Sequence, residues 1–289
     1  MQESSIERQD EDQVYSIDLR DVVETKKEGL YEKMPRFLRR YLKKIVHIDL
    51  LNNIFKRANG RRGIEFAEML IEDFNASVST TGLENVPREG KVMIVGNHPL
   101  GGFDGMTLFW AVGQRRRDIL IPANDFLMYL ENMREHFLPI NKVGSNSANV
   151  RKLEMAFRGD DAIIMFPAGI CSRKQDGVIC DLEWKKTFVT KARNNQRDVV
   201  PVYIYGQNSK RFYRLAKIRK FLKIKFNIEM MFLVDEAYKL KDKNIRMIFG
   251  KPIPYTVFDK RHSDLEWAQL VKNHVYKLKD DPDVIFDGE

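Results

Sequence analysis

Short apolar runs alternate with amphipathic stretches along most of the chain, and this alternation predicts an α/β fold. Runs such as 92–95 and 162–165 have the length and β-branched content of buried strands, and the stretches between the runs repeat apolar residues at helical spacing. Strands that are apolar on both faces are typical of a largely parallel sheet covered by helices. The predicted strands are 91–96, 118–122, 138–141, 161–166, 199–205, 228–234 and 244–249, and the predicted helices are 104–114, 124–135, 146–158, 184–195, 208–222 and 263–278.

The N-terminal residues differ from this pattern. Residues 1–33 are rich in charge and predict a flexible lead. Pro35 suits the first turn of a helix that we expect to run to about Arg57, and 64–74 predicts a second helix. The predicted organisation is therefore a lead (1–33), an N-terminal helical extension (34–78) and one α/β domain (79–289).

The composition is that of a globular protein. The chain has 289 residues, of which 43% are hydrophobic and 31% charged, enough for one large domain with a full core. No apolar run approaches the ~20 residues that cross a bilayer, and residues 1–21 lack the layout of a secretory signal. Only Cys171 and Cys180 occur, and no Cys/His cluster has zinc-like spacing. We therefore expect a reducing compartment, no disulfide framework and no structural metal.

Positive charge is concentrated in two amphipathic stretches. The net charge is +8, and residues 210–225 hold eight basic residues and no acidic one. With a second basic stretch at 36–44, this pattern suits an anionic membrane surface, although a helix packed on the core with a solvated basic face has the same pattern. The sequence carries no helix-turn-helix, zinc-finger or RNP-like signature, so nucleic acid is not an expected partner. The predicted membrane contacts are Arg211, Phe212, Arg214, Leu215, Lys217, Ile218, Arg219 and Leu222.

The turn after the strand at 91–96 contains the parts of a catalytic base. His98 stands six residues before Asp104, a spacing that would point the two side chains about 120° apart on a continuous helix. Gly101 and Gly102 allow the backbone to fold back and bring them together. One interpretation is a base with the carboxylate that orients it. The other is a plain strand-to-helix turn in which the two never touch.

Further predicted strands end in residues suited to binding. Ligands of parallel α/β sheets gather at the carboxyl ends of the strands. Lys142 follows one such strand, and the segment 166–174 follows another, where Arg173 and Lys174 offer cations to an anionic group. Pro201 interrupts a third apolar run, which indicates a sheet edge or a local break because proline cannot donate to the ladder.

Together these blocks resemble the lysophospholipid acyltransferase family, which includes the 1-acylglycerol-3-phosphate acyltransferases. The resemblance covers about residues 79–255 and implies a glycerolipid-acyltransferase-like domain, with a mostly parallel mixed sheet of about seven strands flanked by helices. The blocks that carry it are Asn97-His98 with Asp104, Leu138-Pro139-Ile140-Asn141-Lys142, Phe166-Pro167-Ala168-Gly169 with Ser172-Arg173, and Val200-Pro201-Val202.

Two departures narrow the resemblance. Asp104 lies one residue later than in the family's common first motif, and Ala168 replaces the Glu of its third. The longer loop, the Phe-Pro-Ala-Gly turn and the segment 181–188 are similar to a bacterial branch labelled haemolysin-like or ornithine- and glycine-lipid O-acyltransferases. In the family the third-motif Glu and Arg help to hold the acceptor's phosphate. Without that Glu, a lyso-aminolipid becomes a candidate acceptor beside lysophosphatidic acid.

The resemblance also implies a mechanism and a location. His98 would take the proton of an acceptor hydroxyl while Asp104 holds its other nitrogen, and the oxygen would attack an acyl thioester of acyl carrier protein or CoA. The thioester is a co-substrate, so no cofactor is expected. N–H groups of residues 169–171 are candidates for stabilising the oxyanion. The enzyme would be peripheral, on the cytoplasmic face of the inner membrane. The implied substrate-binding residues are Asn97, Gly101, Gly102, Lys142, Phe166, Pro167, Gly169, Ser172, Arg173 and Lys174.

Three alternatives stay open at this point. Cys171 could be a nucleophile, although a lone cysteine is more often a packing residue. A degenerate acyltransferase that only binds lipid would retain the fold, and a thioester hydrolase would use His98 to activate water. Acyl release without a lysolipid would identify the hydrolase.

Overall fold

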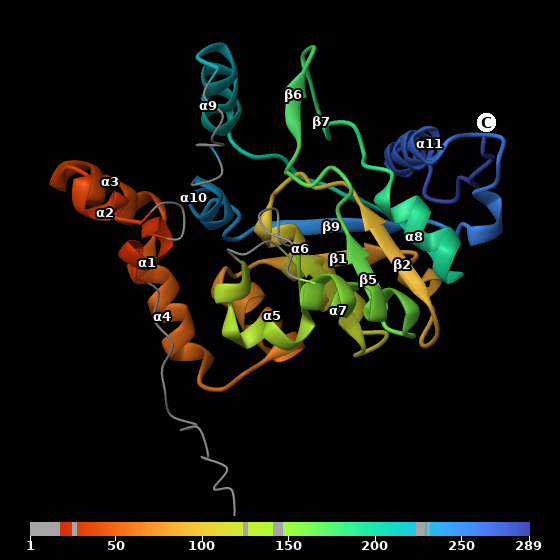
Figure 1. The fold of residues 1–289 in the computed structure, drawn as a ribbon, viewed down its shortest axis with the longest axis horizontal. Helices are drawn as coiled ribbons and strands as arrows, with labels where there is room; N and C mark the ends of the chain where they lie inside the picture. The colour runs from red at the N-terminus through yellow and green to blue at the C-terminus, as the bar shows by residue number, and fades with distance from the viewer. Residues whose placement is uncertain (1–17, 25–27, 124–126, 141–146, 224–228, 230–231) are drawn as a thin grey trace, which may run out of the picture.

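The computed structural model describes residues 18–24, 28–123, 127–140, 147–223, 229 and 232–289, and a seven-stranded sheet forms the centre of this part of the chain (Figure 1). The strand order is β1-β9-β8-β2-β5-β3-β4, and all neighbours are parallel except β8 and β9. This confirms the predicted mostly parallel mixed sheet. The strands are β1 (Ser77–Thr81), β2 (Val92–Gly96), β3 (Ile119–Ala123), β4 (Phe137–Pro139), β5 (Ala162–Met165), β8 (Asp198–Ile204) and β9 (Asn244–Phe249).

The central strand β2 shows how its residues divide the core between the two faces of the sheet. Every residue of β2 is buried, and successive side chains of a strand point to opposite faces. Val92 and Ile94 belong to the core that packs under α5 and α6, whereas Met93 and Val95 belong to the core under α7, α8 and α11. Helices on both faces explain why this strand is apolar throughout. The helices are α5 (Gly63–Asp73), α6 (Gly102–Gly113), α7 (Ser147–Arg158), α8 (Thr187–Asn195) and α11 (Asp264–Lys277).

The N-terminal region is a set of short helices rather than one long one. The predicted single helix from Pro35 to Arg57 is wrong, because the chain breaks at His47, which adopts a φ of 50°. The break lets the neighbouring Ile45 and Ile48 both become buried. Leu19 and Val23, within the predicted flexible lead, are also buried in the core. The division at 33 and 78 stays a prediction. The helices are α1 (Leu19–Glu24), α2 (Leu30–Lys33), α3 (Arg36–Ile45) and α4 (Ile48–Ala58).

Two predicted elements are wrong in their described residues. The predicted strand 228–234 contains Glu229 and Phe232 in 3-10 conformation and the start of α10 (Leu233–Tyr238), while 224–228 and 230–231 lie outside the described residues. The predicted helix 124–135 is a pair of 3-10 turns, η2 (Leu127–Tyr129) and η3 (Glu131–His136), with 124–126 outside the described residues. Both segments are short and rich in apolar residues, and the spacing of apolar residues alone does not distinguish a strand from a helix in such runs.

The sequence pattern also missed three strands. β1 is polar and partly exposed at the edge of the sheet, so it has no apolar signature. The hairpin of β6 (Arg173–Gln175) and β7 (Val178–Cys180) turns at Asp176-Gly177, where both residues have positive φ. Asp-Gly is a strong hairpin signal, and it was available in the sequence. The remaining elements are α9 (Lys210–Phe221), η1 (Leu83–Asn85) and η5 (Tyr255–Val257).

Pro201 lies in β8, which has partners on both sides, so the predicted sheet edge is wrong. β8 runs unbroken from Asp198 to Ile204, and the irregularity lies in its pairing on the β9 side. On this side β8 pairs with β9 at Val202↔Phe249, and with the residues that follow β9 at the bridge Val199↔Ile253. The three residues 250–252 therefore stand opposite the two residues 200–201 of β8. Pro201 stands opposite the extra residue of this bulge, where the regular ladder is interrupted and the missing proline N–H is tolerated.

Candidate active site

His98 and Asp104 meet at the carboxyl end of β2. The chain leaves β2 at Gly96, passes through residues 97–101 and enters α6, which carries Asp104 in its first turn. His98 Nδ1 lies 3.1 Å from Asp104 Oδ2, and the His98 side chain is 16% exposed while the carboxylate is fully buried. The interpretation as a plain turn, in which the two never touch, is therefore wrong.

The loop itself holds the Asp104 carboxylate. Oδ2 accepts hydrogen bonds from the backbone N–H of Leu100 at 2.8 Å and of Gly101 at 3.0 Å. Gly101 adopts a φ of 80°, and a Cβ there would lie 2.8 Å from a methyl carbon of Leu233. The fold-back thus requires glycine at position 101, whereas a Cβ at Gly102 would meet nothing within 4 Å.

The contact between the two side chains favours one tautomer of the His98 imidazole. Burial raises the pKa of the Asp104 carboxyl, and contacts with His98 together with the Leu100 and Gly101 N–H groups oppose that rise. An acceptor oxygen facing Nδ1 keeps the ring proton on that nitrogen. The lone pair of Nε2 is then available to take a proton from a substrate.

The turn after β5 packs directly against His98. The Phe166 ring stacks on His98 with centroids 4.3 Å apart and an interplanar angle of 23°. Gly169, with a φ of 70°, closes the turn by donating its N–H to Phe166 O at 2.9 Å. Farther along, Ser172 N donates to His98 O at 2.7 Å. The predicted residues of the first and third motifs are therefore brought together.

A buried carboxylate, Asp181, joins the same two loops. Its Oδ1 accepts from the His98 N–H at 3.2 Å and from Ser172 Oγ at 2.6 Å, and its Oδ2 accepts from Trp184 Nε1 at 2.9 Å. Sequence reasoning gave this residue no role and noted only that the segment 181–188 is similar to one bacterial branch. No spacing rule points to it, because its partners lie 83 and 9 residues away.

A sequence model described as acyltransferase matches residues 21–284. The chain belongs to the acyltransferase family. It is 46% identical over 278 residues to a "Lyso-glycine lipid O-acyltransferase" of Phocaeicola vulgatus, covering 96% of this chain and 100% of the relative. A protein with the same description from Bacteroides thetaiotaomicron is 44% identical over 270 residues, covering 93% and 99%. These relatives confirm the predicted resemblance and the prediction of an acyltransferase.

Among solved structures, one similar to this acyltransferase is the 1-acyl-sn-glycerophosphate (LPA) acyltransferase PlsC from Thermotoga maritima. The TM-score is 0.46 at 18% sequence identity, and the match covers 90% of this chain and 88% of that one.

Several residues predicted to bind substrate are engaged within the acyltransferase itself. The Asn97 amide bonds to Ile204, donating to its O at 2.9 Å and accepting from its N–H at 2.6 Å, so it ties β2 to β8. Ser172 is buried and donates to Asp181, as described above. Lys174 is exposed on β6. Lys142 lies outside the described residues.

Arg173 is not placed as predicted, namely as a cation available to an anionic group of a ligand. The residue is buried, and its guanidinium lies 2.8 Å from Glu229 Oε1 and donates to Cys171 O at 2.7 Å. Glu229 is fully buried and its other oxygen lies 2.9 Å from Arg219 Nε on α9. This chain of charges connects the third motif to α9.

Cys171 does not have the properties of a nucleophile. It is fully buried, and burial raises the pKa of its thiol to about 11. The thiolate is the reactive form, so the thiol is inert near neutral pH.

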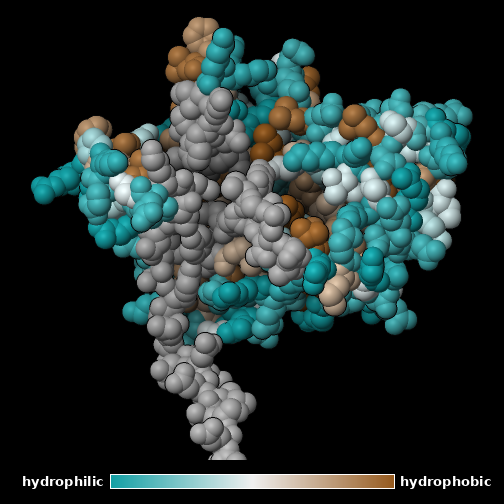
Figure 2. Space-filling view, in the orientation of Figure 1, coloured by the Kyte–Doolittle hydropathy of each residue, from teal (hydrophilic) through white to brown (hydrophobic). Residues whose placement is uncertain are grey.

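The predicted membrane helix α9 is only partly exposed. Phe212 is fully buried and Arg219 is paired with Glu229, so the prediction that these two contact a membrane is wrong. The outer end of α9 has a hydrophobic surface (Figure 2), where Ile218, Phe221 and Leu222 are 46%, 84% and 58% exposed. No helix in the described part of the chain is long and apolar enough to cross a membrane. Arg211, Arg214 and Lys217 are exposed as well, and Leu215 is half-buried.

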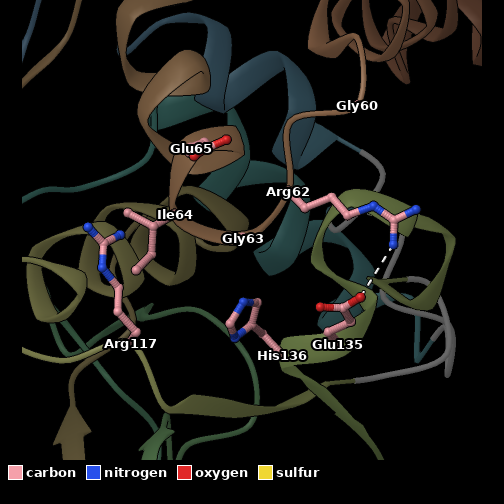
Figure 3. Close-up of a pocket in the computed structure, with 8 residues that line it drawn as sticks. All are labelled: Gly60, Arg62, Gly63, Ile64, Glu65, Arg117, Glu135 and His136. Atoms are coloured by element: carbon pink, nitrogen blue, oxygen red, sulfur yellow. Dashed lines mark hydrogen bonds and ion pairs between the residues drawn. The ribbon is translucent and has the colours of Figure 1, made fainter.

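A surface cavity of about 350 Å³ lies away from the candidate site (Figure 3). His136 faces the start of α5 at Gly63, and its Nδ1 lies 2.8 Å from Ile119 O at the beginning of β3. The amino end of a strand is the opposite edge from the one where parallel α/β sheets hold ligands. None of the residues that line the cavity is a predicted site residue. They are Gly60, Arg62, Gly63, Ile64, Glu65, Arg117, Glu135 and His136.

Proposed function

We propose that this acyltransferase moves a fatty acyl group from a thioester to the hydroxyl of a lyso-aminolipid, with His98 as the general base. The observation that carries the proposal is the 3.1 Å contact of His98 Nδ1 with the buried Asp104, which leaves Nε2 as the proton acceptor. Lipid acylation of this kind needs no covalent enzyme intermediate, in keeping with the inert Cys171 thiol.

The proposed reaction uses three groups: the His98 imidazole, the acceptor hydroxyl and the acyl thioester. Nε2 removes the proton of the acceptor hydroxyl as its oxygen attacks the thioester carbon. The tetrahedral oxyanion then collapses, the C–S bond breaks, and the imidazolium returns the proton to the leaving thiolate. The products are an ester and a free thiol. No cofactor takes part, and the donor is the thioester of acyl carrier protein or of CoA.

The turn at 169–171 supplies the oxyanion donor in this proposal. The Gly169 N–H is already bonded to Phe166 O, which argues against the first residue of the predicted donor group. We assign the role to the next N–H group, that of Ile170. Preorganised donors of this kind typically contribute about 10²–10³ in rate.

The acceptor follows from the relatives and from one substitution. Both relatives described above are named for a lyso-glycine lipid, and they span almost the whole chain. Ala168 stands where the family has the Glu that helps to hold a phosphate, and Arg173 is buried against Glu229. A lyso-glycine lipid is therefore favoured over lysophosphatidic acid.

We also propose a peripheral position on the cytoplasmic face of the inner membrane. On α3, Phe37 and Tyr41 are 74% and 48% exposed among basic residues, and α9 ends in the exposed Phe221 and Leu222. Apolar side chains flanked by cations suit an anionic lipid surface. A double change of Phe221 and Leu222 to Ser should reduce sedimentation with vesicles containing phosphatidylglycerol, and unchanged sedimentation would remove α9 from the membrane contact.

The test of the function is transfer from labelled acyl carrier protein or acyl-CoA to lyso-glycine lipid, lyso-ornithine lipid and lysophosphatidic acid. Transfer to the glycine lipid that is lost in His98→Ala supports the proposal. Preference for lysophosphatidic acid would overturn the acceptor, and full activity of His98→Ala would overturn the base. Release of free fatty acid without any acceptor would identify a thioester hydrolase instead.

A further inference from the structure

The segment 181–186 places a lysine at the turn of the third motif. Asp181 and Trp184 are fully buried and bonded to each other, which fixes the segment. The next residue, Lys185, donates its backbone N–H to Pro167 O at 3.1 Å. Pro167 follows Phe166, whose ring stacks on the His98 imidazole. The backbone of Lys185 is thus anchored one residue from the ring that packs on the base.

The side chain of Lys185 lies over the same turn. A Cβ built on Gly169 would be 2.9 Å from Lys185 Nζ and 3.6 Å from Cε, so the ammonium occupies the space that the glycine leaves open. Lys185 is exposed, and within the described residues its ammonium has no hydrogen bond or ion pair. It is therefore a cation beside the site whose charge is available to a ligand.

The neighbouring arginine differs in this respect. Arg173 is buried, its charge is met by Glu229, and its remaining contacts include backbone carbonyls. Of these two residues, Lys185 rather than Arg173 offers its positive charge to solvent beside the Gly169 turn.

We propose that Lys185 binds the carboxylate of the acceptor lysolipid, an inference that rests on the proposed function. A glycine linked to a fatty acid through its nitrogen keeps a free carboxylate, which is a monoanion at neutral pH. One ammonium matches one negative charge, whereas a phosphate monoester carries nearly two. Lysine also presents a mobile point charge, which suits a headgroup held at the edge of a turn.

The experiment compares lyso-glycine lipid with its primary amide, which has the same shape and no charge. In Lys185→Gln the KM for the acid should rise about tenfold while kcat and the KM for the amide stay unchanged, because one charge-assisted contact is lost. Lys185→Arg should restore most of the affinity. Lys186→Gln is the matched control, since it removes the adjacent exposed lysine and should leave both KM values unchanged.

Calorimetric binding of a short-chain lyso-glycine lipid, without an acyl donor, keeps this test separate from the proposed function. The wild type should bind the acid more tightly than the amide, and Lys185→Gln should lose that preference whether or not transfer occurs. Equal losses for acid and amide would overturn the proposal, as would a raised KM for the acyl donor alone. A Lys185→Gln effect on lysophosphatidic acid but not on the glycine lipid would overturn the carboxylate assignment. Absence of any transfer by the wild type would instead refute the proposed function.

Discussion

Asp181→Asn tests whether one buried carboxylate holds the His98 loop and the third-motif turn in their relative positions. The carboxylate accepts from the His98 N–H and Ser172 Oγ through Oδ1 and from Trp184 Nε1 through Oδ2. Asparagine has one carbonyl oxygen, so it can serve only one side. Its NH₂ group must then face a donor on the other side, and that donor loses its partner.

The magnitude follows from those contacts. A buried donor left without a partner costs about 1–3 kcal/mol, and hydrogen bonds to a charged group exceed neutral ones by roughly 1 kcal/mol. The loss in unfolding free energy is therefore about 2–4 kcal/mol. At about 2–4 °C per kcal/mol for a chain of this size, the Tm should fall by roughly 5–15 °C. A shift of His98 by a fraction of an ångström should also lower kcat by about 10–100-fold.

The assay is thermal unfolding together with kcat, KM and the pH profile of kcat/KM, measured well below the lower Tm. Gln269→Ala is the matched control, because Gln269 bonds both the N–H and the O of Trp184 without contacting His98. It should lower the Tm but leave kcat near the wild-type value. The pH profile of Asp181→Asn should keep its shape, since the His98–Asp104 pair is untouched. If Asp181→Asn loses no more activity than Gln269→Ala, the positioning argument is wrong.

Three further predictions concern the rest of the site. Asp104→Asn should lower kcat by roughly 10³–10⁴ with little change in KM, because an amide can donate to Nδ1 and so favours the wrong tautomer; steady-state kinetics checks this, and a loss under tenfold would contradict it. Glu229→Gln should cost about 3–5 kcal/mol of stability by removing the buried carboxylate that pairs with Arg173, whereas the half-buried Arg219→Gln should cost less than half as much; denaturant unfolding compares them. Iodoacetamide at pH 8 should modify Cys180 but spare Cys171, whose thiol pKa is about 11, and peptide mass spectrometry would show the opposite result if the site were reactive.

The sequence predicted those parts of the fold that depend on local pattern. β2 and β5 are buried on both faces, and their continuous apolar runs marked them plainly. β1 carries Ser77-Val78-Ser79-Thr80-Thr81 and exists because it pairs in parallel with β9. Each paired residue of β9 lies 167 positions later in the chain, as Met247 does from Thr80. Such a strand is specified by its partner rather than by its own residues, so a local pattern cannot find it.

The candidate site divides in the same way. His98 and Asp104 were predictable because both stand on one turn and a glycine at 101 shows how that turn must bend. The role of Arg173 was not, because its partner Glu229 is 56 residues away in a segment that had been predicted as a strand. A cation that the motif offers to a ligand and a cation that the fold has already neutralised look identical in sequence.

The placement of charge around His98 bears on the proposed preference for an acceptor lipid. The guanidinium groups of Arg173 and Arg219 pair with the buried Glu229 and hold the third motif to α9. Lys185, beside Gly169, is exposed to solvent. An acceptor with a compact dianionic headgroup would need more than one available cation to offset its loss of hydration. A monoanionic carboxylate needs only one. Under the proposed function, Ala168 and the buried Arg173 therefore act in the same direction, since each lowers the capacity of the turn to hold a phosphate while leaving the His98–Asp104 pair in place.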